Sequence, residues 1–225
     1  MSIQEYRDVV QGTTEWDDLR RGIVTASTVG QLITPKTVKP AANVGSRALA
    51  ATLASERITG WTEPHYESDD MLRGHLDEPV ARDLYRETTG HAVRETGFIT
   101  RTVDGNTIGY SPDGMVGDDG IIEIKSRVPK KHLATILSGE IPPENVAQVQ
   151  AGLFVSGREW CDYISFCGGM PMWTKRVTPD VRWQSAIIEA LGNLEHAVDE
   201  MIYRYHIATA GLPETERRAE EEMVI

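Results

Sequence analysis

The first part of the chain carries apolar residues at helical spacing. Residues 44–60 place apolar side chains three and four positions apart and end at Gly60, which predicts a helix that stops at this glycine. Residues 68–89 predict a second, longer helix that stops at Gly90. Pro79 lies within this helix, and we expect it to kink the helix or break it at the two preceding residues.

The middle of the chain is rich in β-branched and turn residues. "HAVRETGFITR" and "TIGYSPDGMVG" predict short strands, and residues 120–127, "GIIEIKSR", alternate between apolar and polar side chains as a strand does. "EWCDYISFCGG" and "MWTKRVTPD" predict a pair of strands. Between residues 120–127 and this pair of strands, "PPENVAQVQAGLFVSG" has helical spacing, with Pro142 and Pro143 near its first turn.

A long helix over residues 179–209 closes the pattern. Its apolar residues are spaced 4-3-4-3-4 and form one stripe: Ile187, Leu191, Leu194, Val198, Met201 and Tyr205. We expect this stripe to pack against the protein's own core, with a subunit interface as the alternative. Helices followed by strands, a helix, two strands and a helix indicate an α/β fold with a mixed central β-sheet flanked by helices.

Length and composition fit one globular domain over residues 1–210, followed by a charged tail over 211–225. No apolar run approaches the ~20 residues of a membrane-spanning helix, and the N-terminus does not resemble a signal peptide. Cys161 and Cys167 are too few for a disulfide framework or a cysteine-based metal cluster, and we interpret them as buried thiols in a reducing, cytoplasmic compartment.

The net charge of −11, from 23 basic and 34 acidic residues, argues against a general polyanion binder. It leaves room for a nuclease, because a phosphate site needs only a local basic patch and metal-binding carboxylates are themselves acidic.

The candidate chemistry begins with an aspartate in a turn and a glutamate and lysine on a strand. Asp113 lies in "SPDG", which by itself indicates a β-turn, and Glu123 and Lys125 are two apart on the strand over 120–127. They therefore share a face, roughly 6.6 Å apart along the strand, while Ile122 and Ile124 face the core. Two carboxylates suit Mg²⁺, and an ammonium beside them can orient or help deprotonate an attacking water. Taken alone, the Glu-x-Lys pair also fits a solvated strand face.

Four ordered blocks make the chain similar to one family. "SPDG" with "EIK" resembles the core of the PD-(D/E)-x-K nucleases, whose fold is restriction-endonuclease-like. "EWDDLRRGIVTAS", "RGHLDEPVARDLYRETTG" and "VAQVQAGLFVSG" resemble the remaining blocks of the phage lambda exonuclease, or YqaJ-like viral recombinase, family. The blocks span roughly residues 15–156.

The resemblance implies a set of active-site residues. Asp113, Glu123 and the main-chain carbonyl of Ile124 would hold two Mg²⁺ ions, for which Mn²⁺ can substitute, and Lys125 would position the hydrolytic water. Glu78 matches a glutamate beside the metals. Gln148 and Gln150 point about 200° apart on a helix, and Gln148 is the better candidate.

The resemblance also implies a pocket for a 5′-terminal phosphate, formed by Arg20, Ser27 and Ser111. Other roles remain open from the residues alone. Arg20 could pair with Glu15 or Asp17 on the surface, and Thr25 or Ser27 could cap a short helix over the following residues. Glu78 alone would fit a solvated helix face. Trp16, which fixes the spacing to Arg20, is expected in the core.

One further implied feature departs from the family pattern. Met71, with Leu72 beside it, stands where the family carries an apolar wedge that parts the duplex end.

Together with the residues above, the resemblance implies a Mg²⁺-dependent 5′→3′ exonuclease that leaves 3′ single-stranded overhangs on linear double-stranded DNA for recombination by strand annealing. The resemblance implies a ring-shaped homotrimer, a single-strand annealing protein as partner, no membrane attachment and the cytoplasm of a bacterial host. Two alternatives are a sequence- or structure-specific endonuclease on the same core, and a catalytically silent DNA-end-binding protein.

Overall fold

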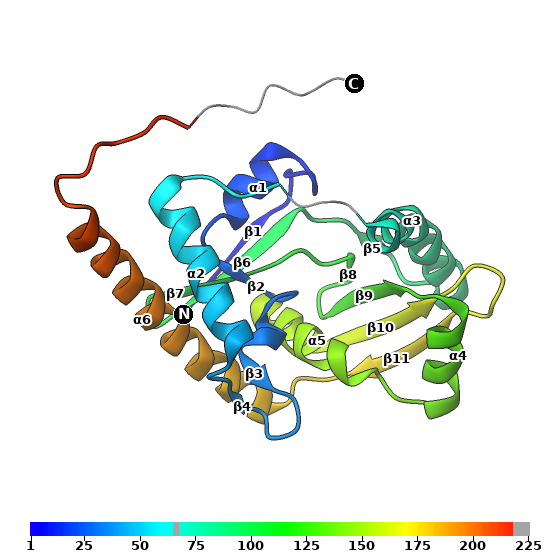
Figure 1. Cartoon of the computed structure of the whole chain (residues 1–225). Coiled ribbons are helices and arrows are strands. Elements are labelled where there is room, and N and C mark those ends of the chain that lie inside the picture. Colours follow the sequence, from blue (N-terminus) through cyan, green and yellow to red (C-terminus); the bar gives the residue numbers. More distant parts are fainter. Residues whose placement is uncertain (65–67, 218–225) are drawn as a thin grey trace.

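The computed structural model describes residues 1–64 and 68–217, which form an α/β fold with sheets flanked by helices (Figure 1). The helices are α1 (Thr14–Arg20), α2 (Val44–Thr59), α3 (Asp69–Thr89), α4 (Pro129–Ser138), α5 (Pro143–Ser156), α6 (Val181–Thr209) and a short 3₁₀ helix, η1 (Val29–Gln31). The strands are β1 (Ser2–Tyr6), β2 (Val24–Thr25), β3 (Ile33–Thr34), β4 (Lys39–Pro40), β5 (Val93–Arg94), β6 (Phe98–Val103), β7 (Asn106–Tyr110), β8 (Gly114–Val116), β9 (Gly120–Ser126), β10 (Trp160–Phe166) and β11 (Trp173–Val177).

The longer strands divide between two mixed sheets instead of forming one central sheet. The first has the order β1-β6-β7-β2, with β2 parallel to β7, and the second has the order β11-β10-β9-β8-β5, with β9 parallel to β10. The chain crosses between the sheets at residues 111–113, directly after β7 and before β8. Pro112 in this crossing has no N–H to donate, so the ladder of β7 cannot continue into β8. The predicted fold class is therefore confirmed, and the crossing explains its division into two sheets.

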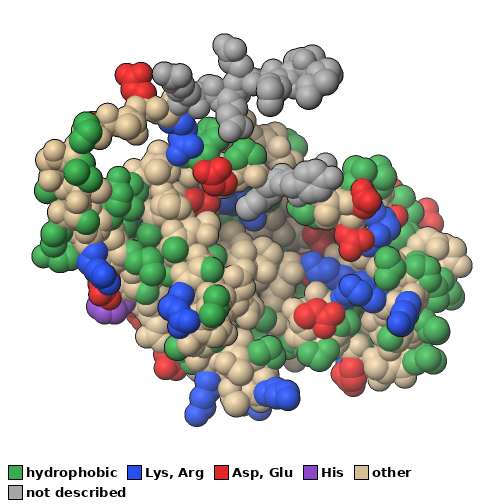
Figure 2. Space-filling model, in the orientation of Figure 1, with side chains coloured by type: hydrophobic (Ala, Val, Ile, Leu, Met, Phe, Trp, Pro, Cys, Tyr) green, Lys and Arg blue, Asp and Glu red, His purple; other side chains and the backbone are tan. Residues whose placement is uncertain are grey.

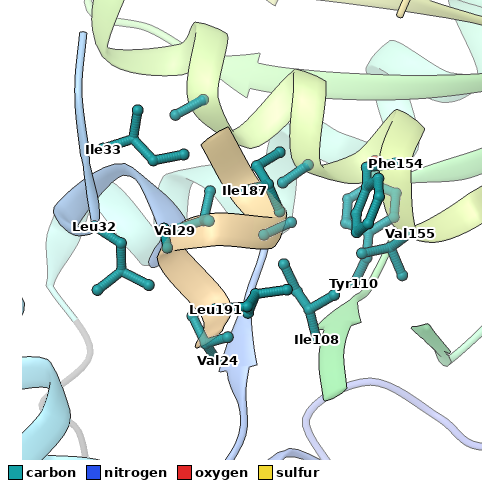
Figure 3. Packing of buried hydrophobic residues seen from close by; sticks show 14 of the residues in the cluster. Val24, Val29, Leu32, Ile33, Ile108, Tyr110, Phe154, Val155, Ile187 and Leu191 are labelled. Carbon is teal, nitrogen blue, oxygen red and sulfur yellow. The ribbon is translucent and has the colours of Figure 1, made fainter. Parts of the chain in front are cut away.

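The main core lies between the first sheet and helices α2, α5 and α6. Figure 3 shows Ile187 and Leu191 of α6 packed with Val24, Val29 and Ile108. The predicted stripe on α6 faces this core from Ile187 to Met201, while Tyr205 is 44% exposed and lies outside it. Each fully buried aliphatic side chain contributes about 1.5–3 kcal/mol to stability, so this helix is held by its own domain.

A second, smaller core fixes the orientation of β9. Ile122 and Ile124 are buried against Ala81 and Tyr85 of α3. Because successive side chains alternate across a strand, Glu123 must face the opposite side of the sheet. The predicted inward orientation of the two isoleucines is confirmed.

The helix ends follow the expected signals, with one correction. Gly60 and Gly90 end α2 and α3 in the left-handed conformation, with φ of 61° and 71°. Of the kink or break expected at Pro79, the break is wrong, because α3 runs continuously from Asp69 to Thr89, and the kink stays a prediction. Proline removes a single N–H from the helical ladder, and the burial of Ala81 and Tyr85 against β9 keeps the following turns in place.

A second correction concerns the short helix near residue 29. Thr28 precedes η1, and neither Thr25 nor Ser27 caps it. The Thr25 and Ser27 hydroxyls instead lie 3.0 Å apart and hydrogen-bond to each other. A two-residue β2 leaves the loop after it free to form this local pair.

The hydrophobic pattern did not predict β1, α1 or α4. In α4 the pattern is inverted, because Leu133 and Leu137 are 49% and 77% exposed while His132 and Thr135 are buried. His132 is accommodated by two hydrogen bonds: Nε2 donates to the Pro171 carbonyl, and Nδ1 shares a hydrogen bond with the Ser165 hydroxyl. Contacts with other parts of the chain therefore determine how this helix is oriented, and its hydrophobic period does not predict that orientation.

The remaining expectations concern the chain as a whole. Cys161 and Cys167 are free and buried, as expected. Among the described residues, no helix is both long enough and apolar enough to cross a membrane. Residues 212–217 follow α6 without regular structure, and the rest of the predicted charged tail lies outside the described residues.

Candidate active site

The D-x₉-E spacing is the geometry of an antiparallel hairpin. Gly114 of β8 pairs with Ile122 of β9. One residue further along this register, Asp113 lies opposite Glu123, at the point where the two strands separate. Asp113 Oδ2 accepts a short hydrogen bond from the Ile124 amide, which holds the aspartate against β9. The nine intervening residues are therefore what the hairpin needs to bring the two carboxylates together.

Glu123 is 1% exposed, and three groups hold its carboxylate. Lys125 Nζ lies 2.7 Å from Oε1, and Gln148 Nε2 donates to the same oxygen at 2.5 Å. The Tyr110 hydroxyl donates to Oε2 at 2.9 Å. Gln150 points elsewhere, donating to the Thr178 carbonyl and accepting from the Asp180 amide. Of the two glutamines, Gln148 is therefore the one that reaches Glu123.

Glu78 lies on α3 and is connected to Asp113 by Arg82, which the sequence analysis did not identify. Arg82, one helical turn later, forms a short ion pair with Glu78 and donates from Nε to the Asp113 carbonyl at 2.8 Å. Its third nitrogen lies 2.8 Å from Glu95. The i, i+4 spacing of Glu78 and Arg82 is visible in the sequence, but the contact with Asp113 depends on how α3 packs.

Tyr110 was also missed, since an isolated tyrosine at a strand end carries no sequence signal. It belongs to the first sheet and reaches Glu123 of the second across the crossing between them. Its ring packs on α5 at Gly152, where a Cβ would lie 2.8 Å from Tyr110 Cζ. Gly152 is thus required by this close approach.

The electrostatics of the site favour a bound cation. Burial, with the charges of Glu123 and Glu78, raises the pKa of Asp113 well above its ordinary value. Burial likewise raises the pKa of Glu78 despite its pairing with Arg82. Burial alone would lower the pKa of Lys125, but the Glu123 and Asp113 carboxylates outweigh it and raise that pKa, so Lys125 remains an ammonium. Among the described residues, Asp113 is the site carboxylate with no ion-pair partner.

The donor set fits a divalent ion of the Mg²⁺ kind, since its ligands would be hard oxygens. The Ile124 amide points to Asp113, and the amide and carbonyl of one strand residue face the same edge. The Ile124 carbonyl therefore faces the Asp113 side, beyond the end of the β8 ladder. The described residues contain no group of three His, Cys, Asp or Glu already arranged around an ion, because Glu123 and Glu78 are turned to Lys125 and Arg82.

Two of the three candidate phosphate-binding residues, Arg20 and Ser111, contact Trp16. The Arg20 guanidinium stacks on the Trp16 ring at 3.9 Å, and Trp16 Nε1 donates to the Ser111 hydroxyl at 2.8 Å. Trp16 is only partly buried, so its expected place in the core is wrong; the polar contact with Ser111 keeps it at the surface. Thr25 of β2 pairs with Gly109 of β7 in parallel register. Ser27 and Ser111 each lie two residues after this pair.

Arg20 is not paired with Glu15 or Asp17. Within the described part of the chain its guanidinium makes no hydrogen bond or ion pair, and the planar group is instead held by the aromatic ring. Burial lowers the pKa of Arg20, partly offset by the charges of Asp17 and Glu56. A partly buried guanidinium without an ion-pair partner is suited to an anionic ligand.

The wedge candidates lie on the exposed side of α3. Met71 and Leu72 are 46% and 49% exposed, and Leu76 and Val80 extend the same apolar surface. Figure 2 shows Lys and Arg side chains gathered over the five-stranded sheet, next to a hollow in this face of the molecule. The net acidic charge of the chain is thus not uniform over its surface.

Comparisons with known proteins agree with this geometry. The YqaJ-like viral recombinase domain matches residues 15–159. Crystal structures of an alkaline exonuclease (LHK-Exo) from Laribacter hongkongensis, alone and in complex with dAMP, are 32% identical; the alignments cover 89% of this chain and 100% of that one, with TM-scores of 0.78 and 0.79. A phage-related exonuclease from Haemophilus somnus 129PT is 14% identical, with 84% and 99% covered and a TM-score of 0.62, and shows the shared fold alone. None of the curated proteins searched matches the chain.

These structures share the restriction-endonuclease-like fold predicted from the sequence. The family domain covers more than half of the chain and contains all the residues assembled above. The chain therefore belongs to the YqaJ-like viral recombinase family, whose members resemble lambda exonuclease.

Proposed function

We propose that this protein is a Mg²⁺-dependent DNA exonuclease that degrades one strand of linear duplexes from 5′-phosphorylated ends. Family membership supports a DNA nuclease. The observation that carries the proposal is the meeting of Asp113, Glu123 and Lys125 at one end of β9, with Glu78 and Gln148 beside them. The product would be a 3′ single-stranded overhang suited to annealing.

In this proposal Asp113, Glu123 and the Ile124 carbonyl would hold two Mg²⁺ ions, or Mn²⁺ in their place. When bound, such ions neutralise charge on the scissile phosphate and acidify a water. The Lys125 ammonium donates to the attacking water and holds it in line with the phosphorus. Gln148 and Tyr110 each hold one oxygen of the Glu123 carboxylate and so keep it in the site.

Arg20, Ser27 and Ser111 would receive the terminal 5′-phosphate. The guanidinium offers two parallel donors to phosphate oxygens, and the hydroxyls add two more. Trp16 supports this arrangement because it touches both Arg20 and Ser111. Seating the terminal phosphate there sets which phosphodiester reaches Lys125, and this would define 5′→3′ polarity.

Three wider features complete the proposal. Met71 and Leu72 would insert at the duplex end and part its strands, since exposed apolar side chains can unstack a base step. The chain would act as a ring-shaped homotrimer that encloses DNA, with a locally basic channel inside an acidic exterior. Its product would be handed to a single-strand annealing protein.

The deciding experiment digests linear duplex DNA labelled at the 5′ or the 3′ end, with a closed circle as control, with and without Mg²⁺. We expect early release of the 5′ label as a mononucleotide, an intact circle, and no cleavage without the metal. Cleavage of the circle would indicate the endonuclease alternative. Binding of ends without any cleavage would indicate a silent end-binding protein.

A further inference from the structure

The loop between α1 and β2 is held from both sides by α2. The Gly22 amide donates to Glu56 Oε2 at 2.7 Å, and the Gly22 carbonyl accepts from Arg57 Nε at 2.7 Å. Gly22 lies two residues after Arg20, in the segment that leads to Ser27. Two adjacent helix residues thus fix both polar groups of one glycine in the middle of the candidate phosphate-binding loop.

Arg57 is itself anchored on a third element. Its two terminal nitrogens meet both oxygens of Glu195 on α6, at 2.6 and 2.8 Å, in a bidentate pair. The pair is largely shielded, with side chains 27% and 16% exposed. A bidentate fork leaves the guanidinium one orientation, and that orientation directs Nε at Gly22.

The glycine is required by this arginine. Gly22 has φ of 70°, and a Cβ there would lie 2.7 Å from Arg57 Cγ. The aliphatic stem of Arg57 therefore packs directly on the glycine backbone. The position of the α1–β2 loop at Gly22 therefore depends directly on the position of Arg57.

Glu56 also acts on Arg20 through its charge. Its charge is one of two that act on the Arg20 guanidinium, yet the two side chains form no ion pair within the described residues, because the Glu56 carboxylate is bound to the Gly22 amide. A loop released from Arg57 would free this carboxylate to compete for Arg20.

We infer that Arg57, anchored by Glu195, is a positioning residue that sets the selectivity for a 5′-terminal phosphate. This inference rests on the proposed function, because it concerns the same Arg20 pocket. Arg57 touches no reacting atom in this account, and it acts through Gly22 on the placement of Arg20 and Ser27.

The test measures kcat/KM on matched duplexes that end in a 5′-phosphate or a 5′-hydroxyl, and takes the ratio. The ratio is independent of the folded fraction, so it separates positioning from loss of stability. In Arg57→Ala we expect the ratio to fall roughly three- to tenfold, the scale of coupling between contacting groups. Arg57→Lys should recover part of it, since lysine keeps the charge without the fork. Arg176→Ala is the matched control, because Arg176 forms a bidentate pair with Asp162 on β10, in the other sheet, and should keep the wild-type ratio.

The outcomes are distinguishable. If Arg57→Ala keeps the wild-type ratio while Arg20→Ala loses it, the pocket stands and the positioning role is refuted. If the wild type itself does not distinguish the two ends, the pocket in the proposed function is wrong and the inference falls with it. Should Arg57→Ala not fold, Glu195→Gln decides, since it loosens the fork and leaves Arg57 in place. An unchanged ratio in that variant refutes the role.

Discussion

Replacing Asp113 with asparagine should make the metal-free protein more stable while abolishing cleavage. Asp113 is the site carboxylate that no cation neutralises within the described chain, since Glu123 pairs with Lys125 and Glu78 pairs with Arg82. Its hydrogen bond from the Ile124 amide needs only an acceptor oxygen, which an asparagine amide retains. The substitution therefore removes repulsion and preserves the local contact.

The magnitude follows from Coulomb's law. Two like charges about 5 Å apart repel by roughly 3 kcal/mol at an effective dielectric constant near 20, and Lys125 offsets part of this. We expect the free energy of unfolding to rise by about 1–2 kcal/mol at neutral pH, which raises Tm by about 2–8 °C for a chain of this size. Differential scanning fluorimetry in EDTA, with urea unfolding followed by circular dichroism, measures both quantities.

The pH dependence tests the cause. The pKa of Asp113 is raised in the folded state, so its contribution to stability is complete below the unfolded pKa and is lost as the pH rises through the folded pKa. The advantage of Asp113→Asn should be largest at neutral and alkaline pH and should vanish below about pH 4, where this carboxyl is protonated in the unfolded chain as well as in the folded one.

Magnesium should reverse the order of stability. A ligand present at about 100 times its Kd stabilises the folded state by about 2.7 kcal/mol, and the wild type should gain more from Mg²⁺ than the variant. Equal Tm values for the two proteins in EDTA at every pH, or a variant that is less stable at neutral pH, would refute the account of the site as an unneutralised carboxylate cluster.

Three other substitutions test separate parts of the structure. Lys125→Ala should slow cleavage at least about a hundredfold while circular dichroism and DNA-end binding by fluorescence anisotropy remain near wild type; unchanged cleavage would remove Lys125 from the mechanism. Pro79→Ala should raise the unfolding free energy by about 1–2 kcal/mol in urea, because Pro79 is exposed within a continuous helix and costs it a hydrogen bond. Gly152→Ala should destabilise the protein by about 1–3 kcal/mol and lower cleavage further than that loss explains, since the new Cβ would displace the Tyr110 ring. Full activity with normal stability would contradict the packing at Gly152.

The parts of the site set by local geometry could be predicted from the sequence. The alternation of "GIIEIKSR" placed Glu123 and Lys125 on one face, and the burial of Ile122 and Ile124 on the opposite face confirms it. The helical period separated Gln148 from Gln150 in the same way. In each case the decision depends on residues within one turn or one strand, where periodicity is informative.

The parts set by packing between distant elements could not be predicted. Arg82 and Tyr110 reach the site only because α3 packs on β9 and β7 ends just before the β8–β9 hairpin. In α4 the apolar period points outward, so hydrophobicity gave no usable signal. The assignment of Trp16 to the core failed for a related reason, since its indole N–H finds a partner in Ser111, far away in sequence.

The crossing between the two sheets explains why the site draws on separated parts of the chain. Tyr110 ends β7 of the first sheet, and Asp113 directly precedes β8 of the second. This short segment therefore contains Tyr110, whose hydroxyl donates to Glu123, the candidate phosphate ligand Ser111, and the candidate metal ligand Asp113. In the first sheet, the pairing of β2 with β7 positions the loop between α1 and β2. The second sheet delivers Glu123 and Lys125. The distance between the proposed phosphate pocket and the proposed metal ligands is therefore fixed by a short segment that contains a proline, and proline restricts the backbone there. A constant spacing between this pocket and the metal ligands would suit the proposed removal of one nucleotide at a time.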